Sequence, residues 1–112
     1  MTVDDLAKGL NLTFLCGKEL AQREVTGCYC GDLLSFVMSR AKSGDAWLTV
    51  MGHLNSIGVA ALTDAACIVL TENAPLDPQA LERAMQNDII VLRTDRPTYE
   101  TAVALSDLFK ED

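Results

Sequence analysis

The feature that most constrains this chain is an ordered alternation of short apolar runs and helix-period segments between Val25 and Phe109. The clearest runs are residues 47–50 (WLTV), 67–70 (CIVL) and 89–92 (IIVL), and each is followed by a polar turn and then by a helix-period segment. Strands that are apolar on both faces and alternate with helices are typical of a parallel sheet that helices cover on both faces. We therefore predict an α/β fold: a single domain over residues 1–112, with a mainly parallel sheet of about four to five strands.

Further elements are predicted from periodicity and capping residues. Additional strands are expected at residues 12–16 and 25–30, although Gly27 interrupts the second run. We expect helices to begin at Val3, Ser56 and Pro97. Two further helices should follow Asp32 and Asp77, each of which would serve as an N-cap.

The same patterns predict which helical side chains face the core. The second helix, capped by Asp32, should bury one face made of Leu33, Leu34, Val37, Met38 and Ala41. Residues 56–62 are apolar on nearly every side, so this helix should be deeply covered. Met85 and Tyr99 are expected to point inward from the last two helices.

Charge and length exclude several classes of protein. Sixteen acidic residues against nine basic ones give a net charge of −7, which repels nucleic acids and anionic membrane surfaces. No apolar run approaches the roughly 18 to 20 residues of a membrane span, and the N-terminus lacks the pattern of a signal peptide. We expect a cytoplasmic protein that binds neither nucleic acid nor membrane.

Four cysteines raise the question of a metal or redox site. Cys28 and Cys30 form a C-x-C pair, which Cys16, Cys67 or His53 could in principle complete as zinc ligands. However, no second paired motif is present, and two cysteines on one face of a strand fit equally well as core thiols. The sequence therefore favours reduced, packed cysteines, with no metal and no cofactor.

Polar side chains gather in the turns that follow the predicted strands. In parallel sheets, ligands bind outside the carboxyl ends of the strands, where helix N-termini present free N–H groups. His53 and Asn55 suit either a pocket or a plain turn, and Arg96 could grip a phosphate or carboxylate. The candidate ligand-binding residues at these turns are Asp32, Ser35, His53, Asn55, Thr71, Asn73, Asp95, Arg96 and Thr98.

The main enzyme motifs are absent from the sequence. It contains no GxxxxGK[ST], no GxGxxG and no HExxH, and no serine or cysteine can be paired with His53 by spacing. We therefore expect that the protein is not an enzyme.

Several of these turns carry a family resemblance. Residues 31–35 (GDLLS), 47–50 (WLTV), 71–75 (TENAP) and 94–102 (TDRPTYETA) resemble the DRTGG domain family, over most of the chain. That family is similar to the N-terminal domain of HPr kinase/phosphorylase, and it also occurs joined to CBS pairs. The resemblance implies a mainly parallel α/β fold and a stand-alone regulatory module. The literal DRTGG string is missing, with MGHLN at residues 51–55 after the central strand, and no kinase domain is present, so kinase activity does not carry over.

Two functions remain open from the sequence. The first is a regulatory module that binds a small anionic or nucleotide-like ligand at the carboxyl edge of the sheet. The second is a subunit that binds only protein, either a partner or its own copy. We also expect a homodimer, because Phe14, Tyr29 and Phe36 are candidates for exposed apolar contacts and twofold pairing is the commonest form of self-association.

Overall fold

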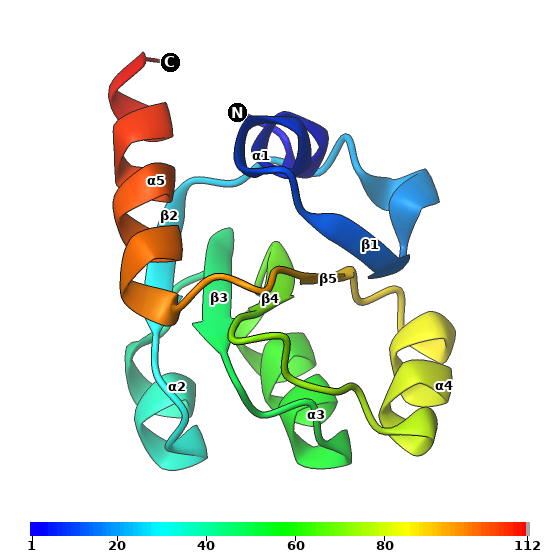
Figure 1. Ribbon diagram of the computed structural model, residues 1–112. Coiled ribbons are helices and arrows are strands. Elements are labelled where there is room, and N and C mark those ends of the chain that lie inside the picture. Colours follow the sequence, from blue (N-terminus) through cyan, green and yellow to red (C-terminus); the bar gives the residue numbers. More distant parts are fainter. Residues whose placement is uncertain (112) are drawn as a thin grey trace.

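Five strands form one sheet in the computed structural model, which describes residues 1–111. The spatial order is β1-β5-β4-β3-β2, and every neighbouring pair is parallel except β1 and β5. The strands are β1 (Thr13–Cys16), β2 (Gly27–Cys30), β3 (Asp45–Thr49), β4 (Cys67–Leu70) and β5 (Val91–Arg93). The predicted α/β fold with a mainly parallel sheet is confirmed (Figure 1).

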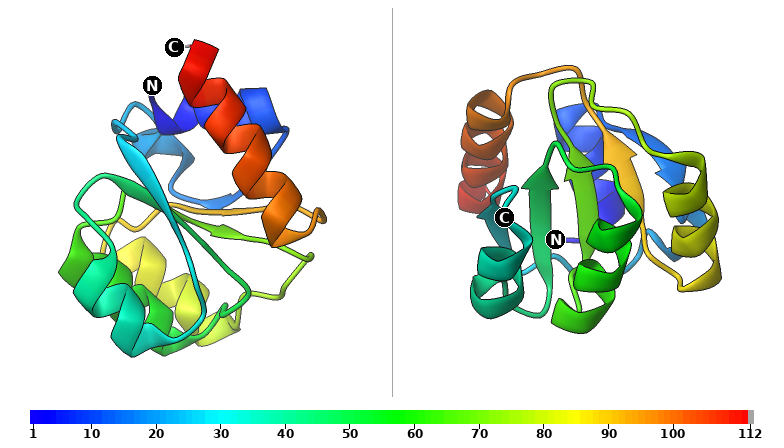
Figure 2. Two further views of the ribbon diagram at one scale, coloured as in Figure 1. Left: turned by 90° about the vertical axis from the view of Figure 1, so that its left-hand side faces the viewer. Right: turned by 90° about the horizontal axis from the view of Figure 1, so that it is seen from below.

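Helices cover both faces of this sheet. Helices α1 and α5 contact each other on one face, while α3 lies between α2 and α4 on the other (Figure 2). The helices are α1 (Val3–Leu10), α2 (Leu34–Arg40), α3 (Leu54–Thr63), α4 (Pro78–Gln86) and α5 (Thr98–Glu111), with a short 3-10 turn η1 (Lys18–Leu20). Each crossover from β2 to β5 therefore passes through one helix, as parallel pairing requires.

The core consists of two apolar clusters, one on each face of the sheet. Trp47 and Leu48 are consecutive in β3 and fully buried, yet they belong to opposite clusters. Side chains alternate between the faces of a strand, so a strand covered on both sides must be apolar at every position. This is why the central strands appear in the sequence as continuous apolar runs.

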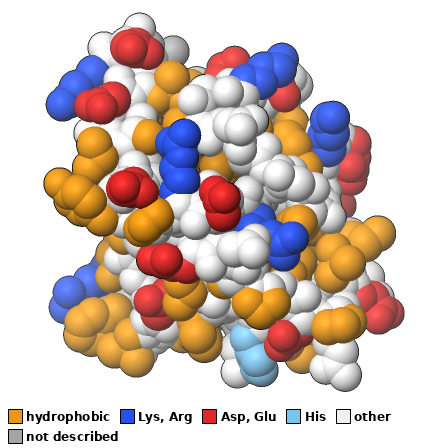
Figure 3. Space-filling view, in the orientation of Figure 1, with side chains coloured by type: hydrophobic (Ala, Val, Ile, Leu, Met, Phe, Trp, Pro, Cys, Tyr) orange, Lys and Arg blue, Asp and Glu red, His pale blue; other side chains and the backbone are white. Residues whose placement is uncertain are grey.

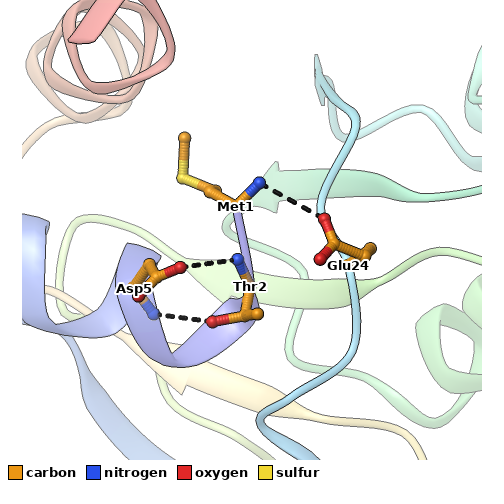
Figure 4. Close-up of polar contacts among 4 residues, drawn as sticks. All are labelled: Met1, Thr2, Asp5 and Glu24. Carbon is orange, nitrogen blue, oxygen red and sulfur yellow. Dashed lines mark hydrogen bonds and ion pairs between the residues drawn. The ribbon is translucent and has the colours of Figure 1, made fainter. Parts of the chain in front are cut away.

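The N-terminus is held by a capping box and an ion pair (Figure 4). The Thr2 hydroxyl accepts a hydrogen bond from the Asp5 N–H at 3.1 Å, and the Asp5 carboxylate accepts one from the Thr2 N–H at 3.0 Å. Hydrogen bonding of the Asp5 carboxylate to Thr2, above all to its backbone N–H, holds the pKa of the Asp5 carboxyl below its ordinary value. The N-terminal amine lies 3.3 Å from the carboxylate of Glu24, which ties the start of α1 to the segment that leads into β2.

The antiparallel strand β1 has one consequence for the site. It follows α1 and pairs with β5 in the register Thr13 with Arg93, with an irregularity between Phe14 and Cys16. Because β1 runs against the other strands, its first residue lies at the edge where β5 ends. The segment around Thr13 therefore joins the carboxyl edge of the parallel strands.

For helix α2, the predicted N-cap and the predicted buried face are both wrong. Its N-cap is Leu33 rather than Asp32, and no side chain makes a capping hydrogen bond. Only Val37 is fully buried, whereas Leu33 is 59% and Met38 53% exposed. The reason is position: α2 follows β2, which lies at the end of the sheet, so the helix has a neighbouring helix on one side alone.

Three other burial predictions are also wrong. Tyr99 is 78% exposed on α5 and Met85 is 63% exposed on α4. Leu62 of α3 is 76% exposed, because α3 buries one face against the sheet and turns its outer face to solvent. The predicted start of α4 is confirmed in position, with Asp77 at the N-cap and Pro78 in the first turn, although the Asp77 side chain makes no capping bond.

Candidate ligand-binding site

The carboxyl ends of β2, β3, β4 and β5 lie at one edge of the sheet, so the turns that follow them are neighbours in space (Figure 1). Main-chain bonds join these turns in pairs. The Gly31 N–H donates to the Leu48 carbonyl at 3.1 Å, and the Asp77 N–H donates to the Gly52 carbonyl at 2.9 Å. The edge is thus a connected rim rather than a set of independent loops.

The turns after β4 and β5 are held together mainly by their backbones. The Glu72 N–H donates to the Arg96 carbonyl and the Asn73 N–H to the Thr94 carbonyl, both at 2.9 Å. Behind them, the hydroxyls of Thr71 and Thr98 share a hydrogen bond at 2.6 Å, and Thr71 is completely buried. The side chains of Asn73, Asp95 and Arg96 are not used in these bonds and are exposed.

A polar pocket of about 300 Å³ opens at this part of the edge. It is lined by Asn11, Thr13, Asn73, Arg93, Thr94 and Asp95. Arg93 is half-buried at the last position of β5, and Asp95 is exposed two residues later. The pocket therefore offers one cation, one carboxylate, two amides and two hydroxyls, a donor set that suits a phosphate attached to a hydroxyl-bearing group.

Four of these lining residues are not among the predicted site residues: Asn11, Thr13, Arg93 and Thr94. Asn11 and Thr13 reach the pocket only because β1 runs antiparallel beside β5, which no local pattern indicates. Arg93 was not predicted because the predicted strand ends at Leu92, one residue before the observed end of β5. Both kinds of residue carry a signal in the sequence. Asn11 follows an amphipathic helix, and it adopts the left-handed C-cap conformation, with φ 57°, that asparagine favours. Arg93 ends an apolar run.

The turns after β2 and β3 use their side chains differently. One carboxylate oxygen of Asp32 accepts from the Thr49 hydroxyl at 2.7 Å and from the Val50 N–H at 2.9 Å. The buried Ser56 hydroxyl donates to the Met51 carbonyl at 2.6 Å. Asp32 thus joins the turn after β2 to the end of β3, and this engagement explains why it does not cap α2.

His53 and Asn55 mark the start of α3. His53 is the N-cap, and its Nδ1 accepts a hydrogen bond from the Asn55 N–H at 3.2 Å. Both side chains are exposed, as is Ser35 in the first turn of α2. Adjacent strands lie about 4.8 Å apart, so the end of β3 is about 10 Å from the end of β5 along the edge.

The nine predicted site residues therefore share one edge but divide into two groups. Asn73 and Asp95 line the pocket, Arg96 is exposed next to it, and Thr71 and Thr98 support it from behind. The other four predicted residues lie at the β2 and β3 end of the edge and do not line the pocket: Asp32, Ser35, His53 and Asn55.

The cysteines differ in their environments. Cys67 is fully buried, and burial raises its pKa to about 12. Cys16 is half-buried and donates to the Ile89 carbonyl at 3.4 Å. Cys28 packs against the core, but Cys30 is exposed, so the expectation of packed thiols is wrong for Cys30. Within residues 1–111, no cluster of three or more His, Cys, Asp or Glu side chains is arranged to hold a metal ion.

Comparison with protein families agrees with this architecture. The model of the DRTGG domain matches residues 5–108. This chain belongs to the DRTGG domain family. No curated protein matches the DRTGG chain.

A solved structure has the same fold. The DRTGG chain is similar to the crystal structure of the CBS and DRTGG domains of the regulatory region of Clostridium perfringens pyrophosphatase, complexed with the activator diadenosine tetraphosphate. The TM-score is 0.76 at 11% sequence identity, and the alignment covers 96% of this chain. It covers 46% of the pyrophosphatase chain, so the DRTGG chain spans about half the length of that neighbour.

None of the helices within residues 1–111 combines the length and the apolar character needed to span a membrane.

Proposed function

We propose that this DRTGG domain is a non-catalytic regulatory module that binds a small anionic, nucleotide-like ligand at the carboxyl edge of its sheet. The observation that carries the proposal is the polar pocket beside β5, which places the half-buried Arg93 among amide and hydroxyl groups. A regulatory region that contains a DRTGG domain, in a protein of the same fold, was crystallised with a nucleotide activator. That neighbour supports the ligand class but does not locate the ligand.

Each group in the pocket has a distinct role in this proposal. The Arg93 guanidinium would form a forked pair of hydrogen bonds with a phosphate, the geometry in which arginine binds oxyanions most strongly. Asn73 and Asp95 would bind hydroxyl or amino groups on the rest of the ligand. Arg96 would add a second positive charge at the rim, which helps an anion to approach a protein whose net charge is −7.

The remaining predicted residues fit an extended ligand or a supporting role. Thr71 and Thr98 would position the two turns, since their hydroxyls bond to each other rather than to solvent. His53, Asn55 and the N-terminus of α3 lie about 10 Å farther along the edge at standard strand spacing, within reach of a second nucleotide moiety. Asp32 would hold the β2 and β3 turns in shape.

Calorimetric titration of the purified chain tests this function. The probes are inorganic phosphate, AMP, ATP and diadenosine tetraphosphate, with sodium sulfate as an anion control. We expect saturable binding of at least one nucleotide, and Arg93→Gln should weaken it by about 10- to 100-fold, the loss of a charge-assisted pair.

The matched control is Arg83→Gln, which removes a positive charge from the exposed surface of α4. This variant should bind as the wild type does. If Arg83→Gln and Arg93→Gln lower the affinity equally, net charge rather than the pocket explains the binding. If no nucleotide binds, the chain is better described as a subunit that binds only protein.

A second proposal concerns self-association, and the exposed apolar side chains of α2 favour it. Leu33, Phe36 and Met38 are 59%, 47% and 53% exposed, and Figure 3 shows hydrophobic side chains gathered over this helix at the lower left. Buried in a twofold interface with a second copy, these side chains would gain hydrophobic stabilisation. Multi-angle light scattering at micromolar concentration should report a dimer. Phe36→Ser should then give a monomer, whereas Leu62→Ser, a change at a more exposed apolar position on α3, should leave the dimer intact.

A further inference from the structure

Cys28 and Cys30 form a close pair of thiols on the edge strand β2. They are two positions apart in an extended strand, so their side chains lie on the same face. Their sulfur atoms are 3.9 Å apart. The pair faces the α5 side of the sheet, where Cys28 packs against the core cluster.

The two thiols are chemically unequal. Cys30 is exposed at the last position of β2, and the hydrogen bond from the Cys28 thiol lowers the pKa of Cys30 to about 7. The same hydrogen bond raises the pKa of Cys28, and its burial and the nearby Asp45 act in the same direction. Partial burial of Cys30 and, to a smaller extent, the charge of Asp32 oppose this lowering of the Cys30 pKa but do not cancel it. One sulfur is therefore an accessible thiolate near neutral pH, and its neighbour is a protonated thiol.

We propose that Cys28 and Cys30 are a redox-active dithiol that hydroperoxides oxidise to an intramolecular disulfide. The Cys30 thiolate attacks one oxygen of the peroxide, the O–O bond breaks, and Cys30 becomes a sulfenic acid as the other oxygen leaves and takes up a proton. The Cys28 sulfur then attacks the sulfenic sulfur, the S–O bond breaks, and the hydroxyl leaves as water with the Cys28 proton. The two thiols lose two electrons in total, and the peroxide gains them.

The geometry of β2 permits this bond and makes it labile. Cα atoms two apart in a strand are about 6.6 Å from each other, near the upper end of the range for disulfides, and the sulfurs must close to about 2.05 Å. Closing the bond must bend the backbone between the two cysteines, at Tyr29, which pairs with Trp47 in the β2–β3 ladder. A disulfide under such strain is readily reduced, as is typical of regulatory rather than structural bridges.

A change in the backbone of β2 would affect the carboxyl edge of the sheet through Gly31 and Asp32. The Gly31 carbonyl accepts the indole N–H of Trp47 at 2.9 Å, and the next residue, Asp32, holds the turn after β3. Oxidation would therefore disturb the hydrogen bonds that shape the β2 and β3 half of the edge. The proposal rests on the two thiols alone and does not depend on a ligand in the pocket beside β5.

Treatment of the reduced, folded chain with a small excess of hydrogen peroxide tests the dithiol. After alkylation of free thiols and digestion, mass spectrometry should find Cys28 and Cys30 in one disulfide-linked peptide, with Cys16 and Cys67 alkylated. Dithiothreitol should restore both thiols. Formation should accelerate as pH rises toward 8, because more of Cys30 becomes thiolate.

Single variants separate the roles of the two sulfurs. Cys30→Ser should slow peroxide consumption by about tenfold or more, because no accessible low-pKa thiol remains. Cys28→Ser should consume peroxide but stop at a sulfenic acid that dimedone traps on Cys30. Cys16→Ser is the matched control, since it removes another half-buried thiol from the opposite edge strand, and it should react as the wild type does.

Two results would overturn the proposal. One is a wild-type chain in which Cys30 passes directly to the sulfinic acid, at the same rate as in Cys28→Ser. The other is a folded wild type, verified by circular dichroism, in which Cys30 reacts with peroxide no faster than the fully buried Cys67.

Discussion

The two halves of the carboxyl edge are built from the same kinds of residue but use them in opposite ways. In the β4 and β5 half, backbone groups join the turns, as in the bond from the Asn73 N–H to the Thr94 carbonyl at 2.9 Å. In the β2 and β3 half, side chains do this work, as in the bonds that the Asp32 carboxylate accepts from Thr49 and Val50. The first half therefore leaves the side chains of Asn73 and Asp95 at a polar pocket, whereas the second half uses the Asp32 carboxylate to hold its turns.

A polar turn is therefore a candidate site only when its side chains are not needed to hold the turn. Asp32 and Asp95 look alike in the sequence, since each is a carboxylate two residues beyond the end of a strand. Their surroundings separate them: Asp32 is bonded to the turn after β3, and Asp95 lines a pocket.

The largest effect is expected at the junction between the two halves. A Cβ at Gly52 would overlap the backbone carbonyl oxygen of Pro75, which cannot move aside as a side chain could. Gly52→Ala should therefore lower the free energy of unfolding by about 3 kcal/mol, measured by urea denaturation. The matched control is Gly58→Ala on α3, where the added methyl group meets nothing within 4 Å and should raise stability by about 0.5 to 1 kcal/mol. A Gly52→Ala protein as stable as the wild type would show that the two halves are not packed against each other here.

A smaller effect separates the two carboxylates. Asp32→Ala removes the acceptor of two hydrogen bonds and should lower the free energy of unfolding by about 1 to 2 kcal/mol. Asp95→Ala, at an exposed position, should change stability by no more than about 0.5 kcal/mol but weaken nucleotide binding. Chemical denaturation and calorimetry measure the two properties independently. The contrast fails if Asp95→Ala destabilises the chain as much as Asp32→Ala does.

The smallest effect concerns one side chain of the pocket. Asn73 adopts the left-handed conformation with φ 54°, which glycine also favours, so Asn73→Gly removes the amide while preserving the turn. It should leave the melting temperature nearly unchanged and weaken nucleotide binding by about fivefold, the value of one neutral hydrogen bond.

Glu72→Gly is the control for this change. Glu72 is also left-handed, with φ 59°, but it does not line the pocket, so its loss should leave the affinity within about twofold of the wild type. An equal loss of affinity in both variants would mean that the shape of the turn, rather than the Asn73 amide, governs binding.

Much of the fold could be predicted from local patterns. Residues 3–10 and 67–70 were assigned to a helix and a strand with the observed bounds, because an amphipathic period and a continuous apolar run are each local signals. The edge that gathers the polar turns also followed, since parallel strands separated by helices must end on the same side.

The exposure of helix faces could not be predicted in the same way. Met38, Met85 and Tyr99 follow an apolar period, yet all three are more than half exposed. A period shows which side chains share a face, but only the neighbouring elements decide whether that face is covered. Helix α2 beside the end strand has fewer neighbours than α3 in the middle of its layer.

The α/β class, the order of most elements and the edge at which the polar turns gather follow from the sequence alone, because these depend on patterns within single segments. The tertiary structure alone decided which residues meet there. Asn11, Thr13 and Arg93 share a pocket because β1 pairs antiparallel with β5, and Asp32 is engaged because β3 ends beside it. Such contacts join segments far apart in the chain, and they are fixed by strand order and direction rather than by any local preference of the residues.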